Sequence, residues 1–461
     1  MKKVALHTLG CKLNFSETST VGRQFIERGF EIVAPDQPAD VFVLNTCSVT
    51  LRADRECQQI IRRVLRQSPD AYVIVIGCYA QLQPEELASI DGVDLVLGAR
   101  EKFSIFEHSS GLRKESLPQV FVSCIDDVAE FAPSSSAEVG NRTRAFLKVQ
   151  DGCDYRCAFC TIPMARGVSR SQSPGAVLSE AKYLAERGFR EIVLTGVNVG
   201  DYGTKDGSSL LELVKAIQDV EGIERIRISS MEPNLLTKDM IDFMLASKVM
   251  CNHFHIPLQS GSDVVLRRMR RRYSRDHYRD LVEYIKSQDP DAGIGADVIV
   301  GFPGETAKFF EETYLFLVDL PVTYLHVFTY SERENTPAAE MEERVEPRTR
   351  SRRNEMLRIL GQKKRYAFHR SFAGRTLPVL FESSRPGGRI SGLTTNYIRV
   401  ETGGTSMLTN SIQPVNITSA DNAGCTGEIS IPSFQTGDGV SNLHTDSYTQ
   451  SLDVAPTMEF L

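Results

Sequence analysis

Short apolar runs alternate with amphipathic segments through the first hundred residues of the chain. The apolar runs have the length of buried strands, and the amphipathic segments repeat their apolar positions with a helical period. The pattern predicts strands at residues 4–8, 41–45, 72–76 and 95–97, with helices at 17–28, 52–66 and 85–90. Such alternation is typical of an open, mostly parallel α/β sheet. Ser16 is expected to cap the first helix.

A second α/β series follows a Ser-rich linker that we predict at residues 133–140. A complete eight-unit barrel needs about 250 residues. Six β/α units over a shorter span therefore predict an incomplete (β/α)6 barrel. Its strands are expected at residues 145–150, 191–195, 225–229, 252–257, 295–300 and 324–329, with helical segments such as 174–187, 210–220 and 276–287 between them.

The last part of the chain has a different pattern. A charged helix is expected at residues 347–370, and the short β-like runs LPVLFE, NYIRV and IQPVNIT follow it between Gly-rich turns. These runs predict a small β-barrel. The final residues are rich in Ser, Thr, Gly and Asp without periodicity, so we expect them to be disordered. The expected domains are therefore residues 1–132, 140–370 and 371–432, with a tail at 433–461.

The charge of the chain is unevenly distributed. Its 461 residues include 53 basic and 59 acidic side chains, a formal net charge of −6, which by itself argues against a nucleic-acid partner. All the basic side chains precede residue 400, however, and seven of the acidic ones follow residue 399. The negative total mainly reflects an acidic C-terminal end and does not exclude RNA.

The cysteines point to chemistry in a reducing compartment. No secretory signal is expected in residues 1–14, and no apolar run approaches the roughly 18 residues of a membrane span. We therefore expect a cytoplasmic protein with no membrane partner. Ten cysteines in that compartment favour metal binding or catalysis over disulfides.

Three of these cysteines form a local motif. Cys153, Cys157 and Cys160 lie in DGCDYRCAFCTIP with the spacing C-x3-C-x2-C, directly after a predicted strand. Three thiolates can hold a four-iron cluster that leaves one iron open for a substrate or cofactor. A structural zinc site completed by a fourth ligand from elsewhere is the alternative.

This motif, with Phe159 before the third cysteine, resembles the radical S-adenosylmethionine (radical-SAM) superfamily. The resemblance implies a [4Fe–4S] cluster held by the three cysteines, whose open iron binds S-adenosylmethionine (SAM). Segment 295–306, GADVIVGFPGET, also resembles a late strand and turn of that barrel. The residues that the resemblance suggests for SAM binding are Gly196, Asn198, Ser229, Glu232 and Gln259.

Three further cysteines each follow a predicted strand of the first sheet. Cys11, Cys47 and Cys78 lie in TLGCKLN, NTCSVT and GCYAQ. Because parallel strands end at the same edge of a sheet, these thiols are expected to meet there. Either a second cluster site or three unrelated buried cysteines would fit this pattern.

The three segments resemble the cysteine motifs of the methylthiotransferase family, a branch of the radical-SAM superfamily. The resemblance spans about 430 residues and implies a second [4Fe–4S] cluster at Cys11, Cys47 and Cys78. It also implies a C-terminal TRAM-type β-barrel that binds tRNA. An electron donor such as flavodoxin or ferredoxin and a separate sulfur source are implied partners, and we expect a monomer.

An arginine-rich segment at residues 265–279 suggests contact with RNA. Arginine and aromatic side chains together suit phosphate binding and base stacking. A solvated helix face is the alternative, and a second basic run lies at residues 348–375. The expected RNA contacts are Arg267, Arg268, Arg270, Arg271, Arg272 and Tyr273.

The family resemblance implies replacement of an aromatic C–H bond by C–S–CH3. A side-chain base cannot remove such a hydrogen near neutral pH, whereas a radical abstraction avoids that limit, so no catalytic side chain is expected. The motifs resemble most the branch that acts on N6-threonylcarbamoyladenosine beside the tRNA anticodon. Isopentenyladenosine in tRNA, a ribosomal-protein aspartate, and a non-enzymatic iron–sulfur protein that binds RNA or senses redox state are the alternatives.

Overall fold

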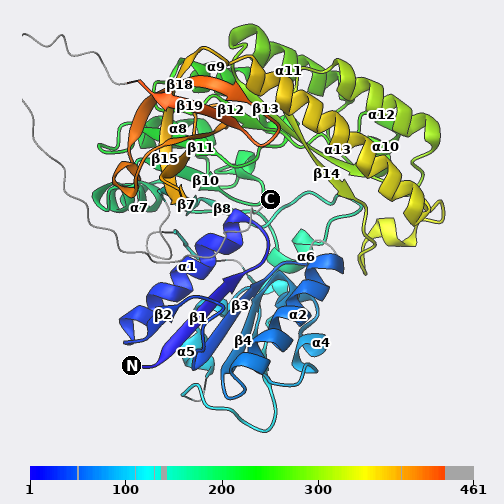
Figure 1. Cartoon of the computed structure of the whole chain (residues 1–461). Helices are drawn as coiled ribbons and strands as arrows, with labels where there is room; N and C mark the ends of the chain where they lie inside the picture. The colour runs from blue at the N-terminus through cyan, green and yellow to red at the C-terminus, as the bar shows by residue number, and fades with distance from the viewer. Residues whose placement is uncertain (49–50, 110, 129, 137–142, 386, 431–461) are drawn as a thin grey trace, which may run out of the picture.

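The computed structural model describes residues 1–48, 51–109, 111–128, 130–136, 143–385 and 387–430. Three units follow one another along the chain (Figure 1). They are a parallel sheet, a partial barrel and a small closed β-barrel. The fold class predicted from the sequence is confirmed, whereas the predicted tail at 433–461 lies outside the described residues.

The first unit is a six-stranded parallel sheet in the order β2-β1-β3-β4-β5-β6. All four predicted strands are present, and two short strands extend the sheet at its edges. The strands are β1 (Lys3–Thr8), β2 (Glu31–Val33), β3 (Val41–Thr46), β4 (Tyr72–Gly77), β5 (Val93–Leu97) and β6 (Gln119–Phe121). The helices are α1 (Lys12–Glu27), α2 (Leu51–Gln67), α3 (Cys78–Leu82), α4 (Pro84–Ala88) and α5 (Ile105–His108).

Helix α1 begins five residues earlier than predicted, so Ser16 does not cap it. Cys11 occupies the N-cap position, and Ser16 is buried inside the helix. The Ser16 hydroxyl donates to the carbonyl of Leu13 and shares a hydrogen bond with Ser134. Ser16 therefore ties α1 to the segment that precedes the partial barrel.

The described residues of this predicted linker, 133–136, pack against the rest of the protein. Ser135 forms a β-bridge with Leu147, and Ser134 and Ser136 are buried. The remainder of the predicted linker, residues 137–140, lies outside the described residues.

The second unit is the predicted partial barrel of six parallel strands. It consists of two neighbouring sheets, β11-β10-β7 and β12-β13-β14. Hydrogen bonds between Ile226 and the backbone of residues 249 and 251 connect them. The strands are β7 (Arg144–Lys148), β10 (Glu191–Thr195), β11 (Arg225–Ile228), β12 (His253–His255), β13 (Gly293–Val300) and β14 (Tyr324–Thr329).

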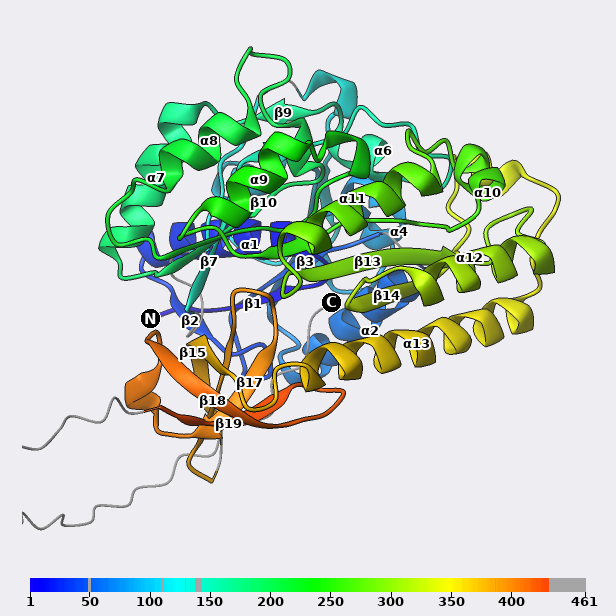
Figure 2. The ribbon, with the colours of Figure 1, turned by 90° about the horizontal axis from the view of Figure 1, so that it is seen from above.

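Helices cover the outer face of this partial barrel (Figure 2). Alternate strand residues such as Leu147, Phe254 and Val298 pack beneath them in one apolar core. The residues between, such as Lys148, His255 and Asp297, lie on the opposite face, which we term the inner face. The main outer helices are α7 (Pro174–Glu186), α8 (Leu210–Ile217), α9 (Lys238–Ala246), α11 (Arg275–Gln288), α12 (Ala307–Asp319) and α13 (Pro347–Arg370).

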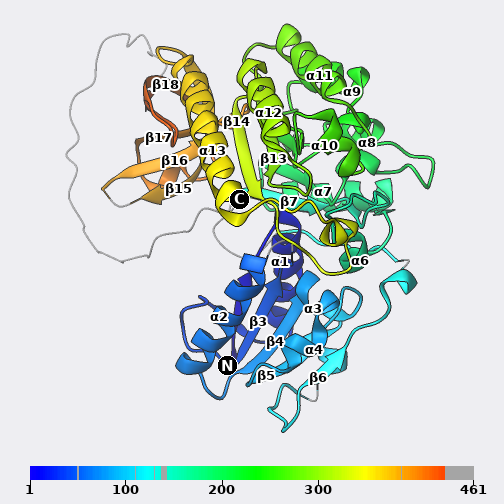
Figure 3. The same ribbon diagram turned by 90° about the vertical axis from the view of Figure 1, so that its right-hand side faces the viewer.

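The third unit is a closed β-barrel in the order β15-β16-β17-β19-β18, as predicted. Figure 3 shows it beside the partial barrel, at the end of α13. Arg225 and Arg227 of the partial barrel donate to carbonyls of its β16–β17 connection and neighbouring strands. The strands are β15 (Thr376–Arg385), β16 (Arg389–Leu393), β17 (Arg399–Gly403), β18 (Ile412–Ala420) and β19 (Cys425–Ile429).

The β-barrel therefore covers the end of the partial barrel at which its strands begin. Arg225 opens β11, and an added Cβ on Gly293, which opens β13, would come within 2.2 Å of the Asn396 carbonyl. None of the described helices is both long enough and apolar enough to cross a membrane.

Candidate functional site

The local cysteine motif lies on the loop between β8 (Gln150–Asp151) and α6 (Ile162–Arg166). Cys157 accepts a hydrogen bond from Arg271 over 3.0 Å, and Cys153 accepts one from the backbone of Tyr155 over 3.4 Å. Burial raises the pKa of Cys153 to about 11 and that of Cys160 to about 12. Cys157 also raises the pKa of Cys153, and both of these thiols raise the pKa of Cys160, so the three thiols lie together at one site.

The residues proposed for SAM binding surround this loop at the carboxyl ends of neighbouring strands. Asn198 is 4% exposed, and neither atom of its side-chain amide has a partner among the described residues. Gly196 packs so closely on Gln150 that an added Cβ would lie 2.9 Å from its amide oxygen. Buried polar groups are rarely left unpaired. The unpaired amide of Asn198 therefore fits a polar ligand such as SAM.

Two other SAM candidates have constrained conformations. Gln259 has a φ of +64°, a left-handed conformation that is unusual for a residue other than glycine. Glu232 forms an ion pair with Arg271, the arginine that also contacts Cys157. Ser229 follows β11 and is half-buried. All five candidates thus lie at the strand ends that adjoin the cysteine loop.

The three N-terminal cysteines follow β1, β3 and β4, which are neighbours in the sheet. Gly10, with a φ of +104°, packs against Cys47, since a Cβ added to Gly10 would lie 3.0 Å from the Cys47 sulfur. Cys11, the next residue, therefore lies close to Cys47. Cys78 is close enough to Cys11 to raise the pKa of the Cys11 thiol. The topology therefore brings Cys11, Cys47 and Cys78 to one edge, as their strand-end positions predicted.

Arg166 connects the two cysteine groups. It ends α6, six residues after Cys160, and α3, which begins at Cys78, packs against α6. Its guanidinium donates to Glu17 over 2.9 Å and to Asn14 over 2.7 Å. Asn14 in turn donates to the carbonyls of residues 9 and 46, which flank the N-terminal cysteines.

Arg166 belongs to a larger buried network. Glu17 also accepts from Lys102 over 2.6 Å and approaches Lys148 over 3.4 Å, and Asp151 accepts from both Lys148 and Arg166. Burial alone would raise the pKa of Glu17, but the surrounding cations outweigh it and hold that pKa well below its usual range.

The network has more cations than anions. Lys102, Lys148 and Arg166 oppose Glu17 and Asp151, and Arg170 approaches Asp151 over 3.7 Å. Three thiolates around a [4Fe–4S] core of charge +2 give a negative site. The donor set and the excess positive charge therefore fit anionic clusters beside both cysteine groups.

We expect Glu17→Gln to lower the free energy of unfolding by about 3 kcal/mol, because it leaves buried cations without their shared partner. Chemical denaturation at pH 7.5 would measure this change. The exposed Glu27 ends the same helix, so Glu27→Gln is the matched control.

The same carboxylate predicts a pH dependence. The pKa of Glu17 is lower in the folded protein than its value of 4.5 in the unfolded chain. The ionised carboxylate therefore stabilises the fold fully above pH 4.5, and this stabilisation is lost as the pH falls towards the pKa of the folded protein. The difference between wild type and Glu17→Gln should therefore shrink as the pH falls below about 4.5. Equal denaturation midpoints at pH 7.5 would contradict the role of the network.

The predicted RNA-contact residues do not share one environment. Arg267, Arg270 and Arg272 are exposed. Arg268 pairs with Glu343, and the Tyr273 hydroxyl donates to the carbonyls of residues 257 and 258.

Arg271 points inward, to Cys157 and Glu232. The sequence showed only a run of arginines and gave no signal for this inward position. It also gave none for Arg166, whose partner Glu17 lies 149 residues away.

Comparison with known proteins agrees with this arrangement. Residues 147–317 match the model of the radical SAM superfamily, and residues 3–98 match that of the uncharacterized protein family UPF0004. The chain is 39% identical to the threonylcarbamoyladenosine tRNA methylthiotransferase MtaB of Bacillus subtilis, over 91% of this chain and 94% of that protein.

Two more relatives extend the comparison. The protein of the same name from Aquifex aeolicus is 38% identical, over 87% of this chain and 96% of that protein. The tRNA-2-methylthio-N(6)-dimethylallyladenosine synthase of Akkermansia muciniphila is 32% identical, over 90% and 96%.

A solved structure shares the fold. The radical S-adenosylmethionine methyltransferase TsrM from Kitasatospora setae superposes with a TM-score of 0.51 at 14% identity, covering 73% of this chain and 77% of that one.

Proposed function

This chain belongs to the radical-SAM methylthiotransferase family, and from that premise we propose that it converts N6-threonylcarbamoyladenosine beside the tRNA anticodon to its 2-methylthio derivative. It is a transferase, and its cofactors are SAM and two [4Fe–4S] clusters. The observation that carries the proposal is the meeting of two three-cysteine sites across α3 and α6.

We propose that Cys153, Cys157 and Cys160 hold the cluster that binds SAM, and that Cys11, Cys47 and Cys78 hold the auxiliary cluster. When bound, these groups supply a carbon-centred radical and the sulfur and methyl group for insertion. The chain's own residues position the reactants and neutralise charge.

Three side chains position SAM or the two cysteine sites. The unpaired amide of Asn198 would accept and donate hydrogen bonds to SAM. Arg271 bonds to both Cys157 and Glu232, and thereby fixes the Glu232 carboxylate next to the cysteine loop. Arg166 maintains the spacing between the two cysteine sites, because it bonds both to Glu17 of α1, the helix that follows Cys11, and to Asp151 of β8, which precedes Cys153.

We extend the proposal to the domains. Residues 1–132 would form the auxiliary-cluster domain, 140–370 the radical-SAM domain and 371–432 a TRAM-like barrel for tRNA. A tRNA substrate would place the enzyme in the cytoplasm, and flavodoxin or ferredoxin is the proposed electron donor.

The exposed arginines of the segment provide a test of RNA binding. We expect Arg267→Glu combined with Arg270→Glu to weaken anticodon stem-loop binding by about tenfold or more, and to reduce its salt dependence, since two phosphate contacts become repulsive. Fluorescence anisotropy against salt concentration would measure both effects. Unchanged affinity and slope would show that these arginines do not contact RNA.

The relative from Akkermansia supports isopentenyladenosine as the second candidate substrate. Mass spectrometry of tRNA nucleosides from a strain lacking the gene separates the candidates. We expect loss of 2-methylthio-N6-threonylcarbamoyladenosine alone, and its return with the wild-type gene. Loss of the methylthio-isopentenyl nucleoside instead would favour the second candidate, and unchanged nucleosides in a strain without a redundant enzyme would reject the tRNA function.

A further inference from the structure

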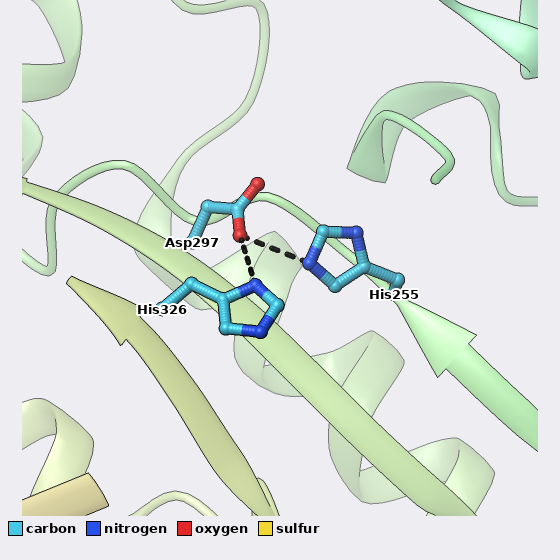
Figure 4. A group of neighbouring side chains, drawn as sticks. All are labelled: His255, Asp297 and His326. Atoms are coloured by element: carbon cyan, nitrogen blue, oxygen red, sulfur yellow. Dashed lines mark hydrogen bonds and ion pairs between the residues drawn. The ribbon is translucent and has the colours of Figure 1, made fainter. Parts of the chain in front are cut away.

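Two histidines and an aspartate form a hydrogen-bonded group on the inner face of the partial barrel (Figure 4). His255 of β12 and His326 of β14 both approach the same oxygen of Asp297, over 2.9 and 3.2 Å. The exposed fraction of the side chain is 14% for His255, 25% for His326 and 21% for Asp297, so solvent reaches all three. None of the cysteines belongs to this group.

An aromatic layer lies next to it, towards the β-barrel. His253 contacts the Tyr324 hydroxyl over 2.7 Å and stacks on Tyr397 at a ring distance of 4.4 Å. Tyr397 comes from the β16–β17 connection and has a φ of +71°. Arg227 fixes that connection by donating to the carbonyls of residues 394 and 395. The C-terminal barrel thus supplies part of the inner surface.

Two cationic side chains, Lys12 and Arg365, act on the aromatic layer next to this group. Neither the Lys12 ammonium nor the Arg365 guanidinium has an ion pair or hydrogen bond within the described parts of the chain. Lys12 is the main cause that lowers the pKa of the half-buried Tyr397, and the guanidinium of Arg365 lies 5.7 Å from the ring centre of Tyr324. Other nearby arginines are neutralised, as Arg227 is by Glu191. An anion is therefore favoured here over a divalent cation or an apolar group.

We propose that Lys12, His255, Asp297 and His326 form the specificity site for the substituent on the adenine N6 atom, and that this site takes an anionic, hydrogen-bonding substituent. The threonylcarbamoyl group, with its carboxylate and hydroxyl, has that chemistry, whereas the isopentenyl group has neither. Lys12 directly follows Cys11, so the specificity site borders the auxiliary-cluster site. This inference rests on the proposed function and assigns residues to its substrate selection.

The two imidazoles bind Asp297 through different ring nitrogens. His255 directs Nε2 and His326 directs Nδ1 to Asp297, which leaves Nδ1 of His255 and Nε2 of His326 for the substrate. Asp297 acts as a positioning residue, because it fixes both ring orientations through one carboxylate oxygen. Lys12 supplies the charge that a carboxylate needs.

The test compares anticodon stem-loops that differ at one adenosine, which carries threonylcarbamoyl, isopentenyl or no substituent. Dissociation constants would be measured anaerobically by fluorescence anisotropy with the reconstituted enzyme. The variants are Lys12→Met and His326→Leu, with Lys12→Arg as the charge-retaining rescue. Lys182→Met, on the exposed side of α7, is the matched control. Iron content and thermal unfolding verify that each variant retains its clusters and fold.

We expect the wild type to bind the threonylcarbamoyl stem-loop about tenfold more tightly than the isopentenyl one, as a charged hydrogen bond predicts. Lys12→Met and His326→Leu should each remove most of that preference, while binding of the unsubstituted stem-loop stays within about twofold. Lys12→Arg should retain the preference.

Two results would overturn the inference. Cluster-loaded Lys12→Met and His326→Leu enzymes that keep the wild-type preference would overturn it while leaving the proposed substrate intact. A wild-type preference for the isopentenyl stem-loop would instead overturn the proposed substrate together with this site.

Discussion

Replacing Cys157 with alanine will abolish reductive cleavage of SAM to 5′-deoxyadenosine. Cys157 lies in the middle of the loop before α6, where it is buried and accepts a hydrogen bond from the guanidinium of Arg271. Two remaining thiols cannot hold the cluster in that geometry. Changes outside the coordination sphere of a metal site already cost 10–100-fold. We therefore expect a loss of more than about 100-fold in 5′-deoxyadenosine formation, measured by liquid chromatography.

The variant should lose iron at one site only. The wild type should bind about eight iron atoms and Cys157→Ala about four, since the auxiliary site lies on separate strands. Cys124→Ala is the control, because Cys124 is exposed and follows no motif. A Cys157→Ala enzyme that cleaves SAM at the wild-type rate would refute the role assigned to the loop.

Replacing Cys47 with alanine should have the complementary effect. This cysteine follows β3, the middle of the three strands that carry the N-terminal thiols, and Gly10 packs directly against it. The loop of Cys153, Cys157 and Cys160 remains intact in this variant. We expect 5′-deoxyadenosine formation to stay within about threefold of wild type, while methylthiolated product falls by more than about 100-fold.

The combination of the two results is more informative than either alone. Product mass and 5′-deoxyadenosine would be measured in the same reaction mixture. If Cys47→Ala still inserted sulfur, the N-terminal cysteines would not hold the auxiliary cluster. If it also lost SAM cleavage, the two sites would not be functionally separable.

The sequence predicted the strands well because buried parallel strands leave continuous apolar runs. It also predicted the meeting of Cys11, Cys47 and Cys78, since all three follow strands of one sheet. It placed the start of α1 too late, because Ser16 looked like a cap, although the helix begins at Lys12. Local signals cannot show that a polar residue is buried by a distant part of the chain.

The rest of the site depends on contacts between distant segments. Arg166 and Glu17 are 149 residues apart, and His326 and Asp297 meet only because β13 and β14 pair in register. Arg271 belongs to a basic run that favoured RNA contact, yet its side chain lies against Cys157. Charge patterns reveal composition along the chain but not the direction in which each side chain points.

The most direct test of the account is the mass of the product formed in a defined reaction. The reconstituted enzyme would be incubated anaerobically with SAM, a reductant, a sulfur source and a stem-loop carrying N6-threonylcarbamoyladenosine. We predict that the adenosine gains one sulfur atom and one methyl group in place of the hydrogen at carbon 2. An adenosine of unchanged mass, in a reaction that nevertheless forms 5′-deoxyadenosine, would contradict the account.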